Sequence, residues 1–173
     1  MFGSAVLHHP IVWAFMALLA WAAWSDFQIY QIPNRICLAI AALYPAYALT
    51  AGLPAITILW ALAIALAAFV AGAGLFAARI MGGGDVKLIA ASALWAGPTL
   101  ILPFLLATGL AGGVLASVLW IAERRRGRPE PVGAAAPATD LLPATGTIPL
   151  PYGVAIAAGG LYTALTILSG QYG

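Results

Sequence analysis

The charged residues of this chain are confined to three short segments, and this confinement limits the folds open to it. All seven lysines and arginines and all five aspartates and glutamates fall within residues 26–35, 79–87 and 123–150. The chain is 64% hydrophobic and only 7% charged, whereas soluble domains carry about 25% charged residues. Because so few charges cannot cover a water-facing surface, the sequence predicts that lipid is the main solvent of the chain.

Five apolar stretches lie between these segments and the uncharged turns, and a helix needs about 20 such residues to cross a membrane. They cover residues 10–25, 36–51, 54–78, 88–122 and 151–168. Gly97-Pro98 interrupts the fourth stretch and predicts a hairpin of two helices there. We therefore predict an all-α, polytopic membrane protein with about six transmembrane helices, folded as one membrane-embedded domain over residues 1–173. Residues 123–150, rich in Pro, Ala, Gly and Thr, predict a flexible loop within it.

The distribution of charge also predicts an orientation. With six helices, the three charged segments lie on one side of the membrane, and the turns near Gly52 and Gly97 lie on the other. The positive-inside rule then places the charged segments in the cytoplasm and both termini outside. We interpret the basic clusters as topology and as contacts with anionic lipid, and not as a nucleic-acid surface.

The stretch between Lys87 and Glu123 is short for two complete crossings. Its 35 residues extend ~52 Å as helix, whereas two crossings need ~60 Å. At least one of the two helices is therefore expected to be short. Asp85, just before the first of them, is then expected to lie below the lipid headgroups.

Asp85 follows three glycines, Gly82, Gly83 and Gly84. A glycine run allows unusual backbone angles and the close approach of another chain segment, and an aspartate placed there accepts hydrogen bonds. The alternative interpretation is a flexible turn whose aspartate caps a helix.

Asp26 ends the first apolar stretch, and an ionisable residue at a membrane boundary is a candidate functional group. Asp26 and Asp85 are the two acids that adjoin apolar stretches in short loops. Two close carboxyls cannot both ionise easily, so one holds a proton while the other acts as a base. This pattern predicts aspartic-protease chemistry without a metal or other cofactor. Cys37 is the only cysteine, which excludes an internal disulfide and a cysteine-based zinc site.

These motifs resemble a known family. Gly82-Gly83-Gly84-Asp85 is similar to the Gly-x-Gly-Asp motif of intramembrane aspartyl proteases, and its continuation through Leu88 resembles type IV prepilin peptidases. Asp26 followed by Ile32-Pro33-Asn34-Arg35 resembles that family's first catalytic aspartate and its downstream Ile-Pro-Asn element. Residues 151–157, Pro-Tyr-Gly-Val-Ala-Ile-Ala, resemble the start of the family's last helix.

The resemblance is strongest to the short members that serve Flp-type (tight adherence) pili. It implies an endopeptidase of the bacterial inner membrane that uses Asp26 and Asp85. Its substrates would be prepilins, in which a short basic leader precedes a hydrophobic helix, cut after a glycine at the cytoplasmic face. The chain lacks the tetracysteine zinc region of the long members, so we expect neither zinc dependence nor their N-methyltransferase activity.

Four further residues are candidates for substrate binding: Gly82, Gly84, Asn34 and Lys87. The two glycines and Asn34 are suited to positioning a substrate backbone. Lys87 and Arg35 flank the expected site, and their roles stay open between contact with lipid phosphate, an electrostatic effect on an aspartate, and membrane topology.

Three other functions remain open at this stage. A small proton-coupled transporter would use the two aspartates as relay groups, although the sequence shows no inverted repeat of the kind common in transporters. A catalytically inert scaffold for pilus assembly would not need Asp85 after a glycine run. A protease of the same superfamily with another substrate is not distinguished by sequence.

Overall fold

The computed structural model describes residues 4–125 and 151–170. Within these ranges the chain forms helices and no strands, so the predicted all-α class is confirmed. The helices are α1 (Ser4–Ile29), α2 (Asn34–Thr50), α3 (Ala55–Ala77), α4 (Gly83–Arg125) and α5 (Tyr152–Leu168). The predicted flexible loop lies, from residue 126 onward, outside the described residues.

Three helical segments of the described chain are long and apolar enough to cross a membrane. They are His9–Ile29, Ala55–Ala77 and Gly83–Ala122, and α5 is a shorter apolar helix. These segments support a membrane-embedded protein. The count of about six spans goes beyond them and stays a prediction.

Helices α1, α2 and α3 each end near a residue whose backbone is left-handed. Gly52 follows α2 with φ 67°, and the amide of Leu53 donates to the Ala48 carbonyl, which closes the predicted turn. Two residues other than glycine adopt the same conformation at helix ends: Tyr30 after α1 (φ 51°) and Arg79 after α3 (φ 59°). Both residues lie in the charged segments that the sequence predicted to separate the apolar stretches, so the positions of these two connections were predicted correctly.

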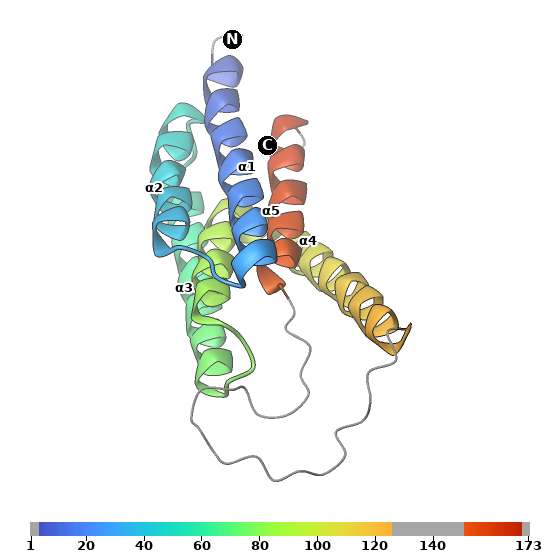
Figure 1. The fold of residues 1–173 in the computed structure, drawn as a ribbon. Helices are drawn as coiled ribbons and strands as arrows, with labels where there is room; N and C mark the ends of the chain where they lie inside the picture. The colour runs from blue at the N-terminus through green and yellow to red at the C-terminus, as the bar shows by residue number, and fades with distance from the viewer. Residues whose placement is uncertain (1–3, 126–150, 171–173) are drawn as a thin grey trace.

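α4 is broken at Gly97, as the Gly-Pro pair predicted. Gly97 has φ 56° and ψ −166°, a conformation that glycine adopts readily, and Pro98 then suits the first turn of a new helix. The first arm of α4, residues 83–96, is ~21 Å long at ~1.5 Å per residue, shorter than a ~30 Å hydrocarbon core. Figure 1 shows the second arm, residues 98–125, turning away from the first at this break.

The helices pack around the first arm of α4 and around α5. α4 contacts α3 and α5, while α1 lies beside α5 and also contacts α2 (Figure 1). The buried Trp95 ring stacks on Phe15 at 4.1 Å between ring centroids, and its indole nitrogen donates to the Ile40 carbonyl at 2.9 Å. α3 buries only Ala61 and Gly72, so its large apolar side chains face outward, as expected of a helix solvated by lipid.

Candidate active site

Asp26 lies in the last turn of helix α1. The sequence had ended the first apolar stretch at Ser25, but α1 continues to Ile29, and the Asp26 carbonyl accepts a hydrogen bond from the Tyr30 amide at 2.9 Å. The helix continues because the residues after Asp26 have no helix breaker before Tyr30 turns left-handed. Asp26 is buried, with only 4% of the residue exposed.

The Asp26 carboxylate is bound by the start of α5. The backbone amide of Gly153 donates to Asp26 Oδ2 at 2.7 Å. α5 receives no side-chain cap from its own preceding residue, Pro151. Because the first amides of a helix have no partner within it, Asp26 acts as a cap supplied by another helix.

The contact between Asp26 and α5 requires glycine at position 153. A Cβ at Gly153 would lie 2.8 Å from Asp26 Oδ2 and 2.7 Å from Ile32 Cδ1. Both distances are shorter than van der Waals contact permits. The Pro-Tyr-Gly element therefore brings a backbone amide close to a carboxylate that a larger residue would displace.

Asp85 lies in the first turn of α4. The sequence had placed it before a helix that begins at Leu88, but α4 begins at Gly83. Asp85 is 8% exposed, and its Oδ1 atom is buried without a hydrogen-bond donor among the described residues. The carboxyl is thus removed from water while one of its oxygens stays unpaired.

The glycine run before Asp85 acts through size and not through unusual angles. None of Gly82, Gly83 and Gly84 has a positive φ, so that part of the expectation is wrong. A Cβ at Gly84 would lie 3.2 Å from Ile32 Cβ and 3.3 Å from its carbonyl oxygen, and one at Gly82 would lie 2.9 Å from Asp85 Oδ2. The glycines allow the α1–α2 connection to approach the start of α4, as the other part of the expectation stated.

Both aspartates line one small cleft of about 250 Å³. The cleft lies between the end of α1, the α1–α2 connection and the start of α4. Its lining residues are Asp26, Tyr30, Gln31, Ile32, Gly82, Gly83, Gly84 and Asp85. The structure thus brings together the two candidate catalytic residues and two of the four candidate substrate-binding residues, Gly82 and Gly84. No group of three or more metal-binding side chains occurs among residues 4–125 and 151–170.

A family comparison agrees with this arrangement. The model of the type IV leader peptidase family matches residues 13–117, which is more than half of the chain and includes both aspartates. The chain belongs to the type IV leader peptidase family. Searches of curated proteins and of solved structures each returned no significant match.

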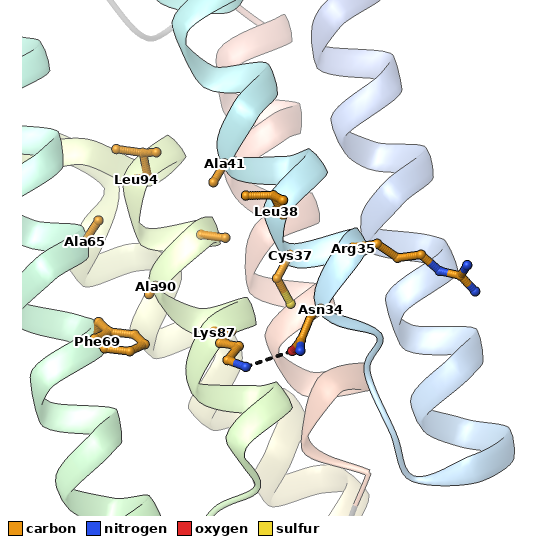
Figure 2. A pocket seen from close by; sticks show the side chains of 11 residues that line it. Asn34, Arg35, Cys37, Leu38, Ala41, Ala65, Phe69, Lys87, Ala90 and Leu94 are labelled. Carbon is orange, nitrogen blue, oxygen red and sulfur yellow. Dashed lines mark hydrogen bonds between the residues drawn. The ribbon is translucent and has the colours of Figure 1, made fainter.

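The peptidase has a second cavity beside the cleft, an open groove of about 640 Å³ between α2, α3 and the first arm of α4. Figure 2 shows the other two candidate substrate-binding residues at one end of this groove, with Lys87 Nζ donating to Asn34 Oδ1 at 2.8 Å. Arg35 also borders the groove, but its side chain points away from this pair (Figure 2). The remaining lining is mostly alanine, leucine and phenylalanine.

The cleft and the groove of the peptidase share a wall. Cys37 lines the groove, and its thiol donates to the carbonyl of Gly84, which lines the cleft, at 3.9 Å between sulfur and oxygen. The four candidate substrate-binding residues are therefore divided between two adjacent cavities.

Sequence reasoning missed several residues of this site. Tyr30 and Gln31 line the cleft, but nothing in their spacing marks them. Gly153 and Ile32 were noted only as parts of longer motifs. The sequence signal for Gly153 was a glycine directly after Pro-Tyr at the start of an apolar helix, where a backbone amide has no partner within the helix. The match to the family model ends before this residue.

Proposed function

We propose that this peptidase is an intramembrane aspartyl endopeptidase in which Asp26 and Asp85 form the catalytic pair. The observation that carries the proposal is the single cleft lined by both carboxyls, each less than a tenth exposed. Family membership supports the removal of leader peptides by the chain. The pairing of two buried acids supports the aspartic type of chemistry.

The reaction follows from two carboxyls that share one proton. The ionised carboxyl takes a proton from water as the water oxygen bonds to the peptide carbonyl carbon, and the protonated carboxyl gives its proton to the carbonyl oxygen. The resulting diol collapses when the first carboxyl returns its proton to the amide nitrogen and the second takes one from a hydroxyl. The C–N bond breaks, and the pair regains its starting protonation state.

The proposed substrate is a prepilin of the Flp type, in which a basic leader precedes an apolar helix. Cleavage at the cytoplasmic face agrees with the position of the cleft, whose lining residues come from the charged segments 26–35 and 79–87. We place the protein in the bacterial inner membrane as a multi-pass chain with both termini outside. Gly82 and Gly84 are proposed to position the substrate backbone in the cleft, and Asn34 and Lys87 to contact the substrate at the rim of the groove.

The test is cleavage of a Flp-type prepilin in membranes, followed as a shift in gel mobility and confirmed by the mass of the mature product. Asp26→Asn and Asp85→Asn are expected to abolish cleavage while the protein stays inserted, because asparagine is nearly isosteric with aspartate. Asp85→Glu is expected to be slowed about 100-fold, since one methylene misplaces the carboxyl by about an ångström.

Asp140→Asn makes the same chemical change outside the proposed motifs and serves as the matched control. It is expected to cleave at the wild-type rate. Near-normal processing by either Asp26→Asn or Asp85→Asn would remove that residue from the mechanism and overturn the proposed catalytic pair.

A further inference from the structure

The two aspartates occupy different electrostatic surroundings. Asp26 Oδ2 accepts a hydrogen bond from the Gly153 amide at 2.7 Å. The Gly82 backbone also acts on the Asp85 carboxyl, but Asp85 Oδ1 is buried with no donor among the described residues. The pair is therefore asymmetric, although both side chains are of one type and line one cleft.

Helix α5 favours a negative charge at Asp26. The amides of its first turn have no partner within the helix, and the helix dipole places partial positive charge at that end. A hydrogen bond from an amide such as that of Gly153 to an ionised carboxylate is stronger than one to a neutral acid. The charge on Asp26 in turn disfavours a second charge on Asp85.

Other groups around the pair do not reverse this asymmetry. The titratable neighbours are Tyr30 in the α1–α2 connection, Cys37 on α2, Lys87 on α4 and Tyr152 on α5. Lys87 is hydrogen-bonded to Asn34, and no lysine or arginine among the described residues forms an ion pair with either carboxyl. The start of α5 is thus the positive element that distinguishes Asp26 from Asp85.

We propose that Asp26 is the ionised member of the pair and Asp85 the protonated one, and that Gly153 is the positioning residue that fixes this order. This inference rests on the proposed function and assigns the roles within it. Asp26 takes the proton from the attacking water, and Asp85 gives its proton to the peptide carbonyl oxygen. In the second half of the reaction Asp26 returns its proton to the amide nitrogen, and Asp85 recovers one from the diol.

The assignment is tested first without any activity measurement. The wild-type peptidase is labelled with ¹³C at the aspartate carboxyls, and the signals are assigned through the distinct pairs Ser25-Asp26 and Gly84-Asp85. At the pH of maximal cleavage we expect the Asp26 carboxyl carbon to have the chemical shift of a carboxylate and the Asp85 carbon that of a carboxylic acid. The reverse order would overturn the proposal.

The role of Gly153 is tested by the pH profile of kcat/KM. In Gly153→Ala the new Cβ displaces the Asp26 carboxylate from the amide at position 153, so ionising Asp26 requires a higher pH. The acid limb of the profile is expected to move upward by about one pH unit, the effect of losing a hydrogen bond to a charged group.

Gly160→Ala is the matched control for Gly153→Ala. It adds the same methyl group to the same helix, 2.7 Å from Leu19 Cδ1 on α1 and away from Asp26. The acid limb of this control is expected to stay in place. An unmoved limb in Gly153→Ala, or an equal shift in Gly160→Ala, would overturn the positioning role.

The outcomes separate this inference from the proposed function. If Gly153→Ala does not fold, the carboxyl spectra of the wild-type protein decide the assignment alone. If the spectra show Asp26 protonated while both Asp→Asn variants are inactive, the catalytic pair stands and the assignment fails. If either Asp→Asn variant cleaves normally, the proposed pair itself fails.

Discussion

The first arm of α4 and helix α3 are adjacent apolar helices that differ in how many of their residues are buried. The arm buries Asp85, Val86, Leu88 and every residue from 91 to 96, whereas α3 buries only Ala61 and Gly72. Both are rich in alanine and leucine, so hydrophobicity does not distinguish them. The difference teaches that burial follows the number of neighbouring helices. α4 contacts α2, α3 and α5, whereas α3 contacts α4, so large side chains such as Trp95 are buried in the arm while most of those on α3 face outward.

The largest difference in the free energy of unfolding is expected between two Trp→Ala variants, one in the arm and one in α3. Trp95→Ala, in the arm, removes ring contacts with Phe15 and Tyr47 and the hydrogen bond to Ile40. We expect it to lower the free energy of unfolding by about 3–5 kcal/mol. Trp60→Ala, in α3, removes a ring that is 57% exposed and should change it by less than about 1 kcal/mol.

The measurement for the tryptophan pair is reversible unfolding in mixed detergent micelles, with both variants compared under the same conditions. Equal losses of stability would contradict the view that α3 and the arm differ in packing.

Two glycines of α3 test one contact between α3 and the arm. A Cβ at Gly72 would lie 2.9 Å from Val86 Cγ1, and valine is stiff at χ1, so the clash is not easily relieved. We expect Gly72→Ala to destabilise the protein by about 1–2 kcal/mol. Gly74→Ala meets nothing within 4 Å and should stabilise it by about 0.5–1 kcal/mol, because alanine is the better helix former.

The same unfolding measurement applies to the glycine pair. The comparison would break if Gly72→Ala were as well tolerated as Gly74→Ala, because the contact of Gly72 with Val86 would then not be tightly packed.

The smallest expected effect concerns the polar contact of the arm with α2. Lys87→Met keeps the length of the side chain but removes the hydrogen bond to Asn34 Oδ1. We expect kcat/KM for prepilin cleavage in proteoliposomes to fall about fivefold, the worth of one hydrogen bond. Arg35→Met, whose side chain points away from this pair (Figure 2), should stay close to wild type. An equal loss in both variants would assign the effect to charge and not to the hydrogen bond.

Much of the fold followed from local sequence signals. Gly52 and the Gly97-Pro98 pair marked a chain turn and a helix break because few other residues adopt these conformations, and the structure has both. The prediction of a short helix after Lys87 was also correct, since the first arm of α4 ends at the Gly97 break. The predicted number of membrane crossings was about six. Length and composition support three long apolar segments among the described residues, so that number stays a prediction.

Less of the site followed from the sequence, and the misses share a cause. Asp26 was expected to end the first apolar stretch and Asp85 to precede a helix, whereas Asp26 lies in the last turn of α1 and Asp85 in the first turn of α4. Hydrophobic pattern shows where lipid contact ends, but a helix continues past that point until its backbone is interrupted. The glycines before Asp85 were expected to adopt unusual angles, and they provide space for Ile32 instead.

The sequence by itself determined that the chain is helical and apolar, that its charges are confined to three segments, and that two aspartates stand within recognisable motifs. These properties depend on neighbours along the chain. Only the tertiary structure decided that the Gly153 amide binds Asp26 while Asp85 Oδ1 has no donor among the described residues. That pairing depends on how α1 and α5 are aligned against each other, and a shift of α5 by one turn, ~5.4 Å, would remove it without changing any local pattern.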